Sequence, residues 1–304
     1  FYDPDNSESF NFKKAYSPVA ASAASSQGRL ARLWRLFDLV APSLKFNPET
    51  PNMELPFSVK PDKKISVKDI MAMTRDKYEG TPYDPARGIL GGPFKNPNYF
   101  RSFKVDKNNY TSSRCISVNK VEYTSITQSR SWLPDAVGGL VWLAFGAQDT
   151  SCYIPLYAGI TRLPISFSIG DHWVFDRHSA RWAFDYADFH TQVVYSHAIK
   201  DVRKAQNKYE KQALDTIPVI DKFAEKLYKQ SPAAASRFLT DYCVNNAESI
   251  IKAWWEMGDK LLVKYNHFQI NNISDRKTRR LSMPDDWNRA IVKEEKLKPV
   301  KKRR

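Results

Sequence analysis

The sequence predicts an α+β fold in which long helices cover a mostly antiparallel sheet. Between residues 114 and 157, short segments rich in Val, Ile, Thr, Trp and Tyr are separated by turns, a pattern typical of antiparallel strands. From Ser179 onward, apolar residues recur instead at helical spacing. Because the strands come first and the helices follow, we expect the helices to be layered on the sheet.

Size and composition are those of a globular protein. The 304 residues are 42% apolar and 13% aromatic, which is ample for a packed interior. The longest apolar stretch, from Gly138 to Ala147, has the length of a buried strand, so we expect no membrane span. The chain begins at Phe1 without an initiator Met or the regions of a signal peptide, which looks like an entry into the middle of a longer protein.

The first predicted elements are two helices separated by a loop. Apolar residues fall on one helical stripe over Gly28–Val40, and a proline shortly afterwards ends that helix. Further prolines make residues 43–64 an irregular excursion over the surface. Ser66 and Asp69 then form a variant capping box, which predicts a helix over Val67–Lys77.

A long ordered loop and four strands come next. Residues 78–98 combine Gly, Pro and Asn with aromatic side chains, and ordered loops of this length are often functional. The segment Gly139–Phe145 is apolar at every position, so we expect it to be covered on both faces. The predicted strands are Arg114–Val118, Glu122–Ser129, Gly139–Phe145 and Ser151–Tyr157.

Helices are expected to fill the remainder of the fold. The pattern predicts one helix over Ser179–Leu214 and a second over Val219–Lys229. Ser231 and Pro232 suit the N-cap and first helical positions of a third helix that continues to about Tyr265.

The positive charge is concentrated at the C-terminal end. Of the net charge of +14, residues 276–304 carry +8. Such a run can bind nucleic acid, but Lys301-Lys302-Arg303-Arg304 has no interleaved aromatic residues on which bases would stack. We therefore expect a solvated, partly disordered tail over 276–304 and do not expect nucleic acid as a partner.

Common catalytic patterns are not found in the sequence. The histidines have no metal-ligand spacing, and no phosphate-binding loop or nucleophile elbow occurs, so we expect neither a metal nor an organic cofactor. The three cysteines are widely spaced and odd in number, which predicts small buried residues rather than a disulfide framework. They leave the redox compartment undecided.

Polar residues next to rigid elements are the candidates for a cleft. They occur at the end of a predicted strand over Thr127–Arg130, after the apolar strand over Asp149–Tyr153, and in the ordered loop at Glu79 and Thr81. The alternative is that Thr150 and Ser151 only turn the chain and that Glu79 caps or pairs locally, because Ser, Thr and Asp at strand ends usually satisfy the backbone of turns.

A series of short motifs resembles the dipeptidase A-like cysteine peptidases of family C69. The order of the motifs matters more than any one of them, and the resemblance covers about Ser66 to Tyr265. The motifs are Tyr78-Glu79-Gly80-Thr81-Pro82-Tyr83-Asp84, Gly92-Pro93-Phe94, Gln128-Ser129-Arg130 with Leu133-Pro134-Asp135, Gly138-Gly139-Leu140-Val141-Trp142, Thr150-Ser151-Cys152-Tyr153-Ile154-Pro155-Leu156-Tyr157 and Ser179-Ala180-Arg181-Trp182-Ala183-Phe184.

The resemblance implies an N-terminal nucleophile hydrolase with a four-layer αββα fold. In such an enzyme a processed N-terminal Cys attacks the peptide carbonyl, and its own α-amine, with an ordinary pKa near 8, accepts the thiol proton. Position 1 here is Phe, and the three cysteines lie within matched or structural segments. We therefore expect the nucleophile in a missing N-terminal portion, residues 1–275 to be the downstream part of a dipeptidase domain, and this chain alone to be inactive.

The resemblance and the residues together give two hypotheses for function. The first is a cysteine dipeptidase acting on short peptides, in which an Arg fork holds the free carboxylate of the substrate. The second is a non-catalytic binding or structural protein with a basic surface and a degenerate cleft. Arg181 could equally be an ion-pair partner at a helix start, and the sequence leaves homo-oligomerisation open. The expected substrate-binding residues are Glu79, Thr81, Gln128, Arg130, Thr150, Ser151 and Arg181.

Overall fold

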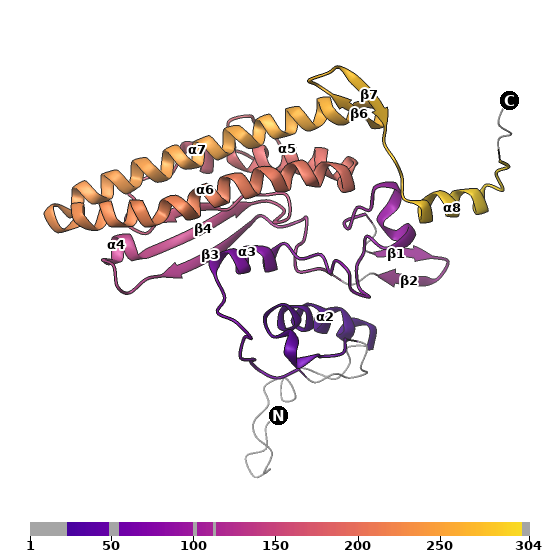
Figure 1. Cartoon of the computed structure of the whole chain (residues 1–304), viewed down its shortest axis with the longest axis horizontal. Coiled ribbons are helices and arrows are strands. Elements are labelled where there is room, and N and C mark those ends of the chain that lie inside the picture. Colours follow the sequence, from indigo (N-terminus) through magenta and orange to yellow (C-terminus); the bar gives the residue numbers. More distant parts are fainter. Residues whose placement is uncertain (1–22, 49–54, 100–101, 112–113, 300–304) are drawn as a thin grey trace, which may run out of the picture.

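Helices and antiparallel strands make up the structure, which confirms the α+β class. The computed structural model describes residues 23–48, 55–99, 102–111 and 114–299. In Figure 1 two long helices, α6 (Tyr195–Gln230) and α7 (Pro232–Tyr265), run side by side above strands β3 and β4, while α3 (Val67–Thr74) lies beneath them. No helix among the described residues is both long and apolar enough to cross a bilayer.

The central sheet has three antiparallel strands in the order β3-β4-β5. They are β3 (Tyr123–Ser129), β4 (Gly139–Phe145) and β5 (Ile154–Tyr157), and a short helix, α4 (Asp135–Gly138), joins the first two. Burial alternates along β4, so that one face is fully buried and the other is half-buried. The apolar run is therefore covered on both faces, but not equally.

The two edges of this sheet differ. Within β5, the Tyr157 amide donates to the Cys243 thiol of α7 at 3.4 Å, and Pro155 has no amide hydrogen. Just before the strand, the Tyr153 amide donates to the Glu210 carboxylate of α6 at 2.9 Å. Helix side chains thus occupy the outer edge of β5. On β3, no strand among the described residues pairs with the outer edge, and every second residue from Tyr123 is exposed.

The C-terminal helices begin at the residues that the sequence indicates. The Ser179 and Ser231 side chains cap α5 (Ala180–Val193) and α7, and Pro232 is the first residue of α7. The short 3-10 helix η3 (Ile165–Phe167) precedes α5, and η4 (Asn266–Phe268) follows α7.

The predicted break between two helices, placed between Leu214 and Val219, is wrong, whereas the start at Ser179 and the end near Lys229 are confirmed. The chain breaks at the buried Val194, where φ is −137° and ψ is 50°. Here the Asn96 side-chain amide donates to the Gln192 carbonyl at 2.8 Å, satisfying one of the free carbonyls at the end of α5. No break occurs at Pro218, because Ala213, Ile217 and Ala224 are buried on both sides of it and hold α6 continuous.

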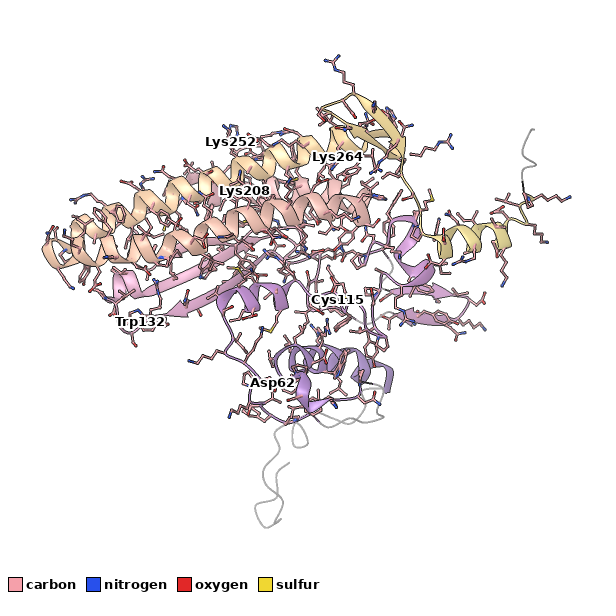
Figure 2. All side chains as sticks on the ribbon, in the orientation of Figure 1. Asp62, Cys115, Trp132, Lys208, Lys252 and Lys264 are labelled. Carbon is pink, nitrogen blue, oxygen red and sulfur yellow. The ribbon has the colours of Figure 1, made fainter. Side chains whose placement is uncertain are left out.

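Helix α2 (Ala23–Val40) connects the N-terminal segment to the rest of the fold, and the short 3-10 helix η1 (Pro42–Leu44) follows it. Arg35 of α2 pairs with Asp76 at 2.8 Å, just after α3. The capping box predicted at the start of α3 is present, with Ser66 and Asp69 bonded reciprocally. Cys115 lies between α2 and the rest of the fold (Figure 2), where it packs with Ala31 and Tyr78.

The loop after α3 is long and ordered, as expected. It contains one 3-10 segment, η2 (Gly88–Phe94), and is otherwise built of turns. Tyr78 adopts a φ of 64° although it is not glycine, and its ring is fully buried. Such a conformation persists in a non-glycine residue only where the surrounding packing enforces it.

The strand predicted over Arg114–Val118 is wrong. This segment is irregular, and the Ser117 amide donates to the Asp76 carbonyl at 3.0 Å while the Val118 amide donates to the Gln148 side chain at 3.2 Å. Its backbone groups therefore pair with loops rather than with a strand. The hairpin of β1 (Ser102–Val105) and β2 (Asn108–Thr111), which was not predicted, precedes it.

Much of the predicted basic tail is regular structure. Strand β6 (Gln269–Asn272) pairs with β7 (Lys277–Arg280), and α8 (Asp285–Glu294) follows. Residues 300–304 lie outside the described part of the chain. No residue of α8 is buried, so this helix is solvated as expected. The tail is nevertheless ordered over β7 and α8.

Candidate active site

A cluster of charged side chains is buried where three segments of the fold meet. Lys77 comes from the loop after α3, Asp149 from the connection between β4 and β5, and Asp188 from α5. The Lys77 ammonium lies 2.9 Å from the Asn98 side-chain oxygen and 3.5 Å from the Asp149 carboxylate. The Lys77 side chain is 1% exposed and that of Asp149 is 0% exposed. A charge pair so fully desolvated is rare outside functional or tightly specified sites.

Hydrogen bonds fix both carboxylates of this Lys77 cluster. Asp149 accepts from the Tyr195 hydroxyl at 2.9 Å. Asp188 accepts from the Thr150 hydroxyl and from the Gln192 amide, each at 2.7 Å. Burial, and then the negative charge of Asp149, raise the pKa of Asp188 from 3.8 to about 7. One acid of the cluster can therefore hold or release a proton near neutral pH, which is a common property of catalytic sites.

A second buried ion pair lies beside the cluster. The Arg75 guanidinium forms two hydrogen bonds with the Glu210 carboxylate and also donates to the carbonyls of Gln148 at 3.0 Å and Ser151 at 3.1 Å. It further lies 5.0 Å from the centre of the Tyr153 ring. Arg75 therefore joins α3, the β4–β5 connection and α6, and holds the backbone around Asp149 in place.

An open groove lies over the Lys77 cluster. We call it the α6 groove; its cavity volume is 670 Å³, within the range of about 300–1,000 Å³ typical of small-molecule sites. Tyr195 and Arg203 connect the groove to the cluster, because both line the groove and both bond to Asp149. Its lining residues are Glu79, Tyr195, Ile199, Lys200, Arg203, Lys204 and Asn207.

Four of the seven predicted substrate-binding residues lie in or next to this region. Thr150 is bonded to Asp188, and Ser151 is 1% exposed with a hydroxyl that has no hydrogen-bond partner among the described residues. Glu79 lines the α6 groove, and its carboxylate accepts from the Lys77 amide at 2.8 Å. Thr81 is buried and donates to the Tyr78 carbonyl at 2.8 Å, so its hydroxyl stabilises a turn of the loop.

Gln128 and Arg130 lie at the opposite end of the sheet. Ser129 pairs with Gly139 at the start of β4, whereas Thr150 follows the end of that strand. Gln128 accepts from the Trp142 indole at 3.2 Å. The Arg130 guanidinium is buried, pairs with Asp221 of α6 and donates to the Gly138 carbonyl at 3.1 Å. Both side chains are engaged in the packing of the sheet.

Arg181 is part of an ion-pair network at the start of α5. It pairs with Glu122 and, at 2.7 Å, with Asp185 one turn along the helix. Burial raises the pKa of Asp185 even though Arg181 opposes that effect. A hollow of 310 Å³ lies beside these residues, lined also by Phe145 and Trp182. In the structure Arg181 therefore has the second role considered for it, that of an ion-pair partner at the start of a helix.

The residues of the Lys77 cluster were largely missed from the sequence. Lys77 and Asp188 look like the polar positions of amphipathic helices, and only tertiary packing buries them. The one signal in the sequence for this cluster is Asp149, a polar residue that stands beside Thr150 just after an apolar strand. Arg203 lies at a half-buried position of α6 among many surface cations, so its place at the groove could not be read from the pattern.

All three cysteines are buried and poorly suited to nucleophilic attack. Burial raises the pKa of Cys115 and of Cys243 to about 12, and that of Cys152 well above its ordinary value. A reactive cysteine needs the opposite, a lowered pKa and access to solvent. Across the described ranges, no three His, Cys, Asp or Glu side chains are grouped so that they could hold a metal ion.

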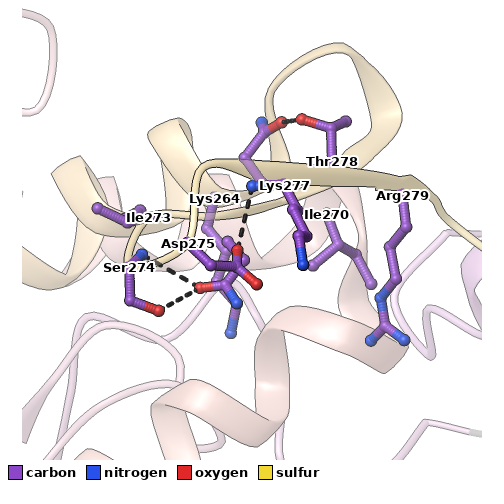
Figure 3. A pocket seen from close by; sticks show the side chains of 10 residues that line it. Lys264, Ile270, Ile273, Ser274, Asp275, Lys277, Thr278 and Arg279 are labelled. Carbon is purple, nitrogen blue, oxygen red and sulfur yellow. Dashed lines mark hydrogen bonds between the residues drawn. The ribbon is translucent and has the colours of Figure 1, made fainter.

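Another hollow lies on the β6–β7 hairpin, and its volume exceeds that of the α6 groove. Its volume is 830 Å³, and Figure 3 shows Ile270, Ile273 and Arg279 around it. Several of its polar groups bond to one another within the hairpin; for example, the Ser274 amide and hydroxyl both donate to the Asn272 side chain. Size alone therefore does not make this hollow the better candidate.

Comparison with known proteins identifies the family. The model of peptidase family C69 matches residues 1–208, which is more than half of the sequence and includes the Lys77 cluster and the α6 groove. The chain belongs to peptidase family C69. This match ends within α6, whereas the resemblance was expected to extend to about Tyr265.

Curated relatives of this C69 chain are named as dipeptidases. Probable dipeptidase B of Lactococcus lactis subsp. lactis (strain IL1403) is 32% identical over 116 residues, 38% of the chain and 21% of that protein. A probable dipeptidase of Salmonella dublin is 29% identical over 164 residues, 52% of the chain and 32% of that protein. Dipeptidase A of Lactobacillus helveticus is 28% identical over 133 residues, 44% of the chain and 24% of that protein. The chain therefore spans between a fifth and a third of these relatives.

Proposed function

We propose that the protein containing this chain is a cysteine-type dipeptidase, in which these residues form one wall of the substrate site. The observation that carries the proposal is the convergence of the Glu79 loop and the Thr150 connection on one buried cluster beneath an open groove. Both segments belong to the motifs that resemble the family, although they are far apart in the sequence. The names of the relatives favour hydrolysis over the non-catalytic alternative.

The attacking sulfur comes, in this proposal, from outside the 304 residues. The raised pKa and burial of the three cysteines support it, because none of them supplies a thiolate at neutral pH. An N-terminal Cys would transfer its thiol proton to its own α-amine, attack the carbonyl carbon and return that proton to the leaving amine. Asp188, whose pKa is raised by burial to about 7, would tune the electrostatics beside the reacting groups.

The four-layer αββα arrangement is part of the same proposal. The sheet β3-β4-β5 with its helices would provide layers of the fold, and the outer edge of β3 would face the remainder of the enzyme. The absence of a partner strand on β3 among the described residues supports this placement. Residues 1–275 would then belong to one domain, and residues 1–304 alone would be inactive.

The test is an assay of the product of the complete coding sequence on a panel of dipeptides. We expect hydrolysis that a thiol alkylator abolishes and a chelator leaves unchanged. The matched control is the 304-residue chain by itself, for which we expect no turnover. Activity lost to the chelator but retained after alkylation would refute the mechanism, as would alkylator-resistant turnover by the isolated chain.

A further inference from the structure

Unpaired positive charge lines one wall of the α6 groove. Lys200, Arg203 and Lys204 are spaced at i, i+3 and i+4, so they share one face of the helix. In the part of the chain that the structure describes, Lys200 and Lys204 form no ion pair, whereas the neighbouring Asp201 is bonded to Lys264 and Tyr265. Lys200 and Lys204 therefore bring positive charge to this wall that no ion pair among the described residues offsets.

Arg203 is held in a fixed orientation within this wall. One terminal nitrogen, Nη1, donates to the Asp149 carbonyl and to the Gln206 side chain, each at 2.9 Å. No hydrogen bond within the described ranges engages its Nε and Nη2 groups. These two groups form one edge of the planar guanidinium, and such an edge matches both oxygens of a carboxylate. Because the plane is already fixed, little conformational entropy remains to be lost when an anion binds.

Glu79 adds the opposite charge to the same groove. Its carboxylate lines the hollow and is exposed, with one oxygen bonded to the Lys77 amide. A groove with cations along α6 and an acid in the loop after α3 can attract a ligand that carries both charges. A free dipeptide is such a ligand, with an ammonium and a carboxylate separated by about 7 Å of extended chain.

Internal acids already bind the two arginines predicted to hold substrate and the buried Arg75 beside the Lys77 cluster. Arg130 pairs with Asp221, Arg181 with Glu122 and Asp185, and Arg75 with Glu210. Each would have to break an internal ion pair to bind a substrate carboxylate. Arg203 would not, because no acidic side chain among the described residues pairs with it.

We propose that the α6 groove is the subsite for the free C-terminal carboxylate of the peptide, with Arg203 as its two-point ligand. Lys200 and Lys204 strengthen the local positive potential, and Glu79 attracts the substrate ammonium. The proposal rests on the proposed function and deepens it, because it predicts a preference for short peptides with a free C-terminus. A longer or amidated peptide places no carboxylate at Arg203.

The first test compares free-acid and amidated dipeptides as substrates of the full-length enzyme. Wild type should prefer the free acid, and Arg203→Gln should raise KM for the free acid by about 10- to 100-fold, since a hydrogen bond to a charged group contributes about 1.5–3 kcal/mol. The KM of the amide should change little. Lys222→Gln is the matched control, because it removes one positive charge from the same helix about 28 Å from Arg203.

A second test separates failure of this subsite from failure of the proposed function. Calorimetry would measure binding of a hydroxyethylene dipeptide isostere, as acid and as amide, so that no turnover is required. We expect Arg203→Gln to weaken binding of the acid at least tenfold and to leave the amide unaffected. Equal wild-type affinity for acid and amide would overturn the proposal, as would equal losses for both in the variant. Competition by acetate as effective as by the isostere would indicate a non-specific anion site and also overturn it.

Discussion

Replacing Asp188 with Asn should change how the stability of the protein depends on pH. The Asp188 carboxyl is buried beside Asp149, and its pKa is raised from 3.8 to about 7. Each pKa unit corresponds to about 1.4 kcal/mol, so ionising Asp188 in the folded protein costs about 4 kcal/mol. Asn keeps an oxygen that can accept from Thr150 and Gln192 but removes the ionisable group.

The sign follows from proton binding. Between about pH 4 and pH 7 the folded protein holds a proton on Asp188 that the unfolded chain has released, so this group's stabilising contribution falls as pH rises. The contribution is fully present below pH 3.8 and is lost through pH 7. Asp188→Asn should therefore match wild type near pH 4 and exceed it by up to about 4 kcal/mol at pH 8.

Urea denaturation followed by tryptophan fluorescence between pH 4 and pH 8 would measure this difference. Trp254, whose indole donates to the Thr150 carbonyl at 2.9 Å, provides a probe close to the site. Asp241→Asn is the matched control, because Asp241 is exposed on α7 and should give at most a constant offset. Parallel pH curves for wild type and Asp188→Asn would refute the reasoning that Asp188 holds its proton in the fold.

Two substitutions and one labelling experiment test the packing of the fold. Ser66→Ala should lower the free energy of unfolding by about 1 kcal/mol through loss of the helix cap, measured by thermal melting. Because its bonds to Ser66 lower the pKa of Asp69 to about 2, the stabilisation from this cap should fade as pH drops below about 4. The three cysteines should react with a thiol reagent at pH 8 only after unfolding; rapid reaction in the native protein would contradict their burial. Glu210→Gln should cost about 3 kcal/mol or more in urea titrations, because it leaves the buried Arg75 charge unpaired, whereas an unchanged midpoint would show that the pair is dispensable.

Local sequence signals predicted the elements whose ends depend on nearby residues. The capping box at Ser66, the strand over Gly139–Phe145 and the Ser231-Pro232 helix start all occur where expected. Each depends on short-range chemistry: side-chain capping, turn residues or a fixed proline dihedral. The same reasoning failed at Pro218, where packing on both sides of the proline outweighs its lost hydrogen bond.

The candidate site was only partly predictable, because it depends on contacts between distant segments. The sequence indicates Thr150 by its position after an apolar strand and Glu79 by its position in a long ordered loop. It does not indicate Lys77, Asp188 or Arg203, since a charged residue on an amphipathic helix is normally solvated and only the three-dimensional arrangement buries it. Arg130 and Arg181 were assigned to substrate although each has an internal acidic partner that lies 91 or 59 residues away.

The unequal edges of the central sheet have a practical consequence for anyone who purifies this chain. Cys243 and Glu210 accept hydrogen bonds from amides in and just before β5, so its outer edge is covered. The seven residues of β3 include no proline and no charged side chain, either of which would discourage pairing with another strand. In a concentrated solution of residues 1–304, copies should therefore associate through β3, and yield and crystallisation would depend on how well that strand is shielded.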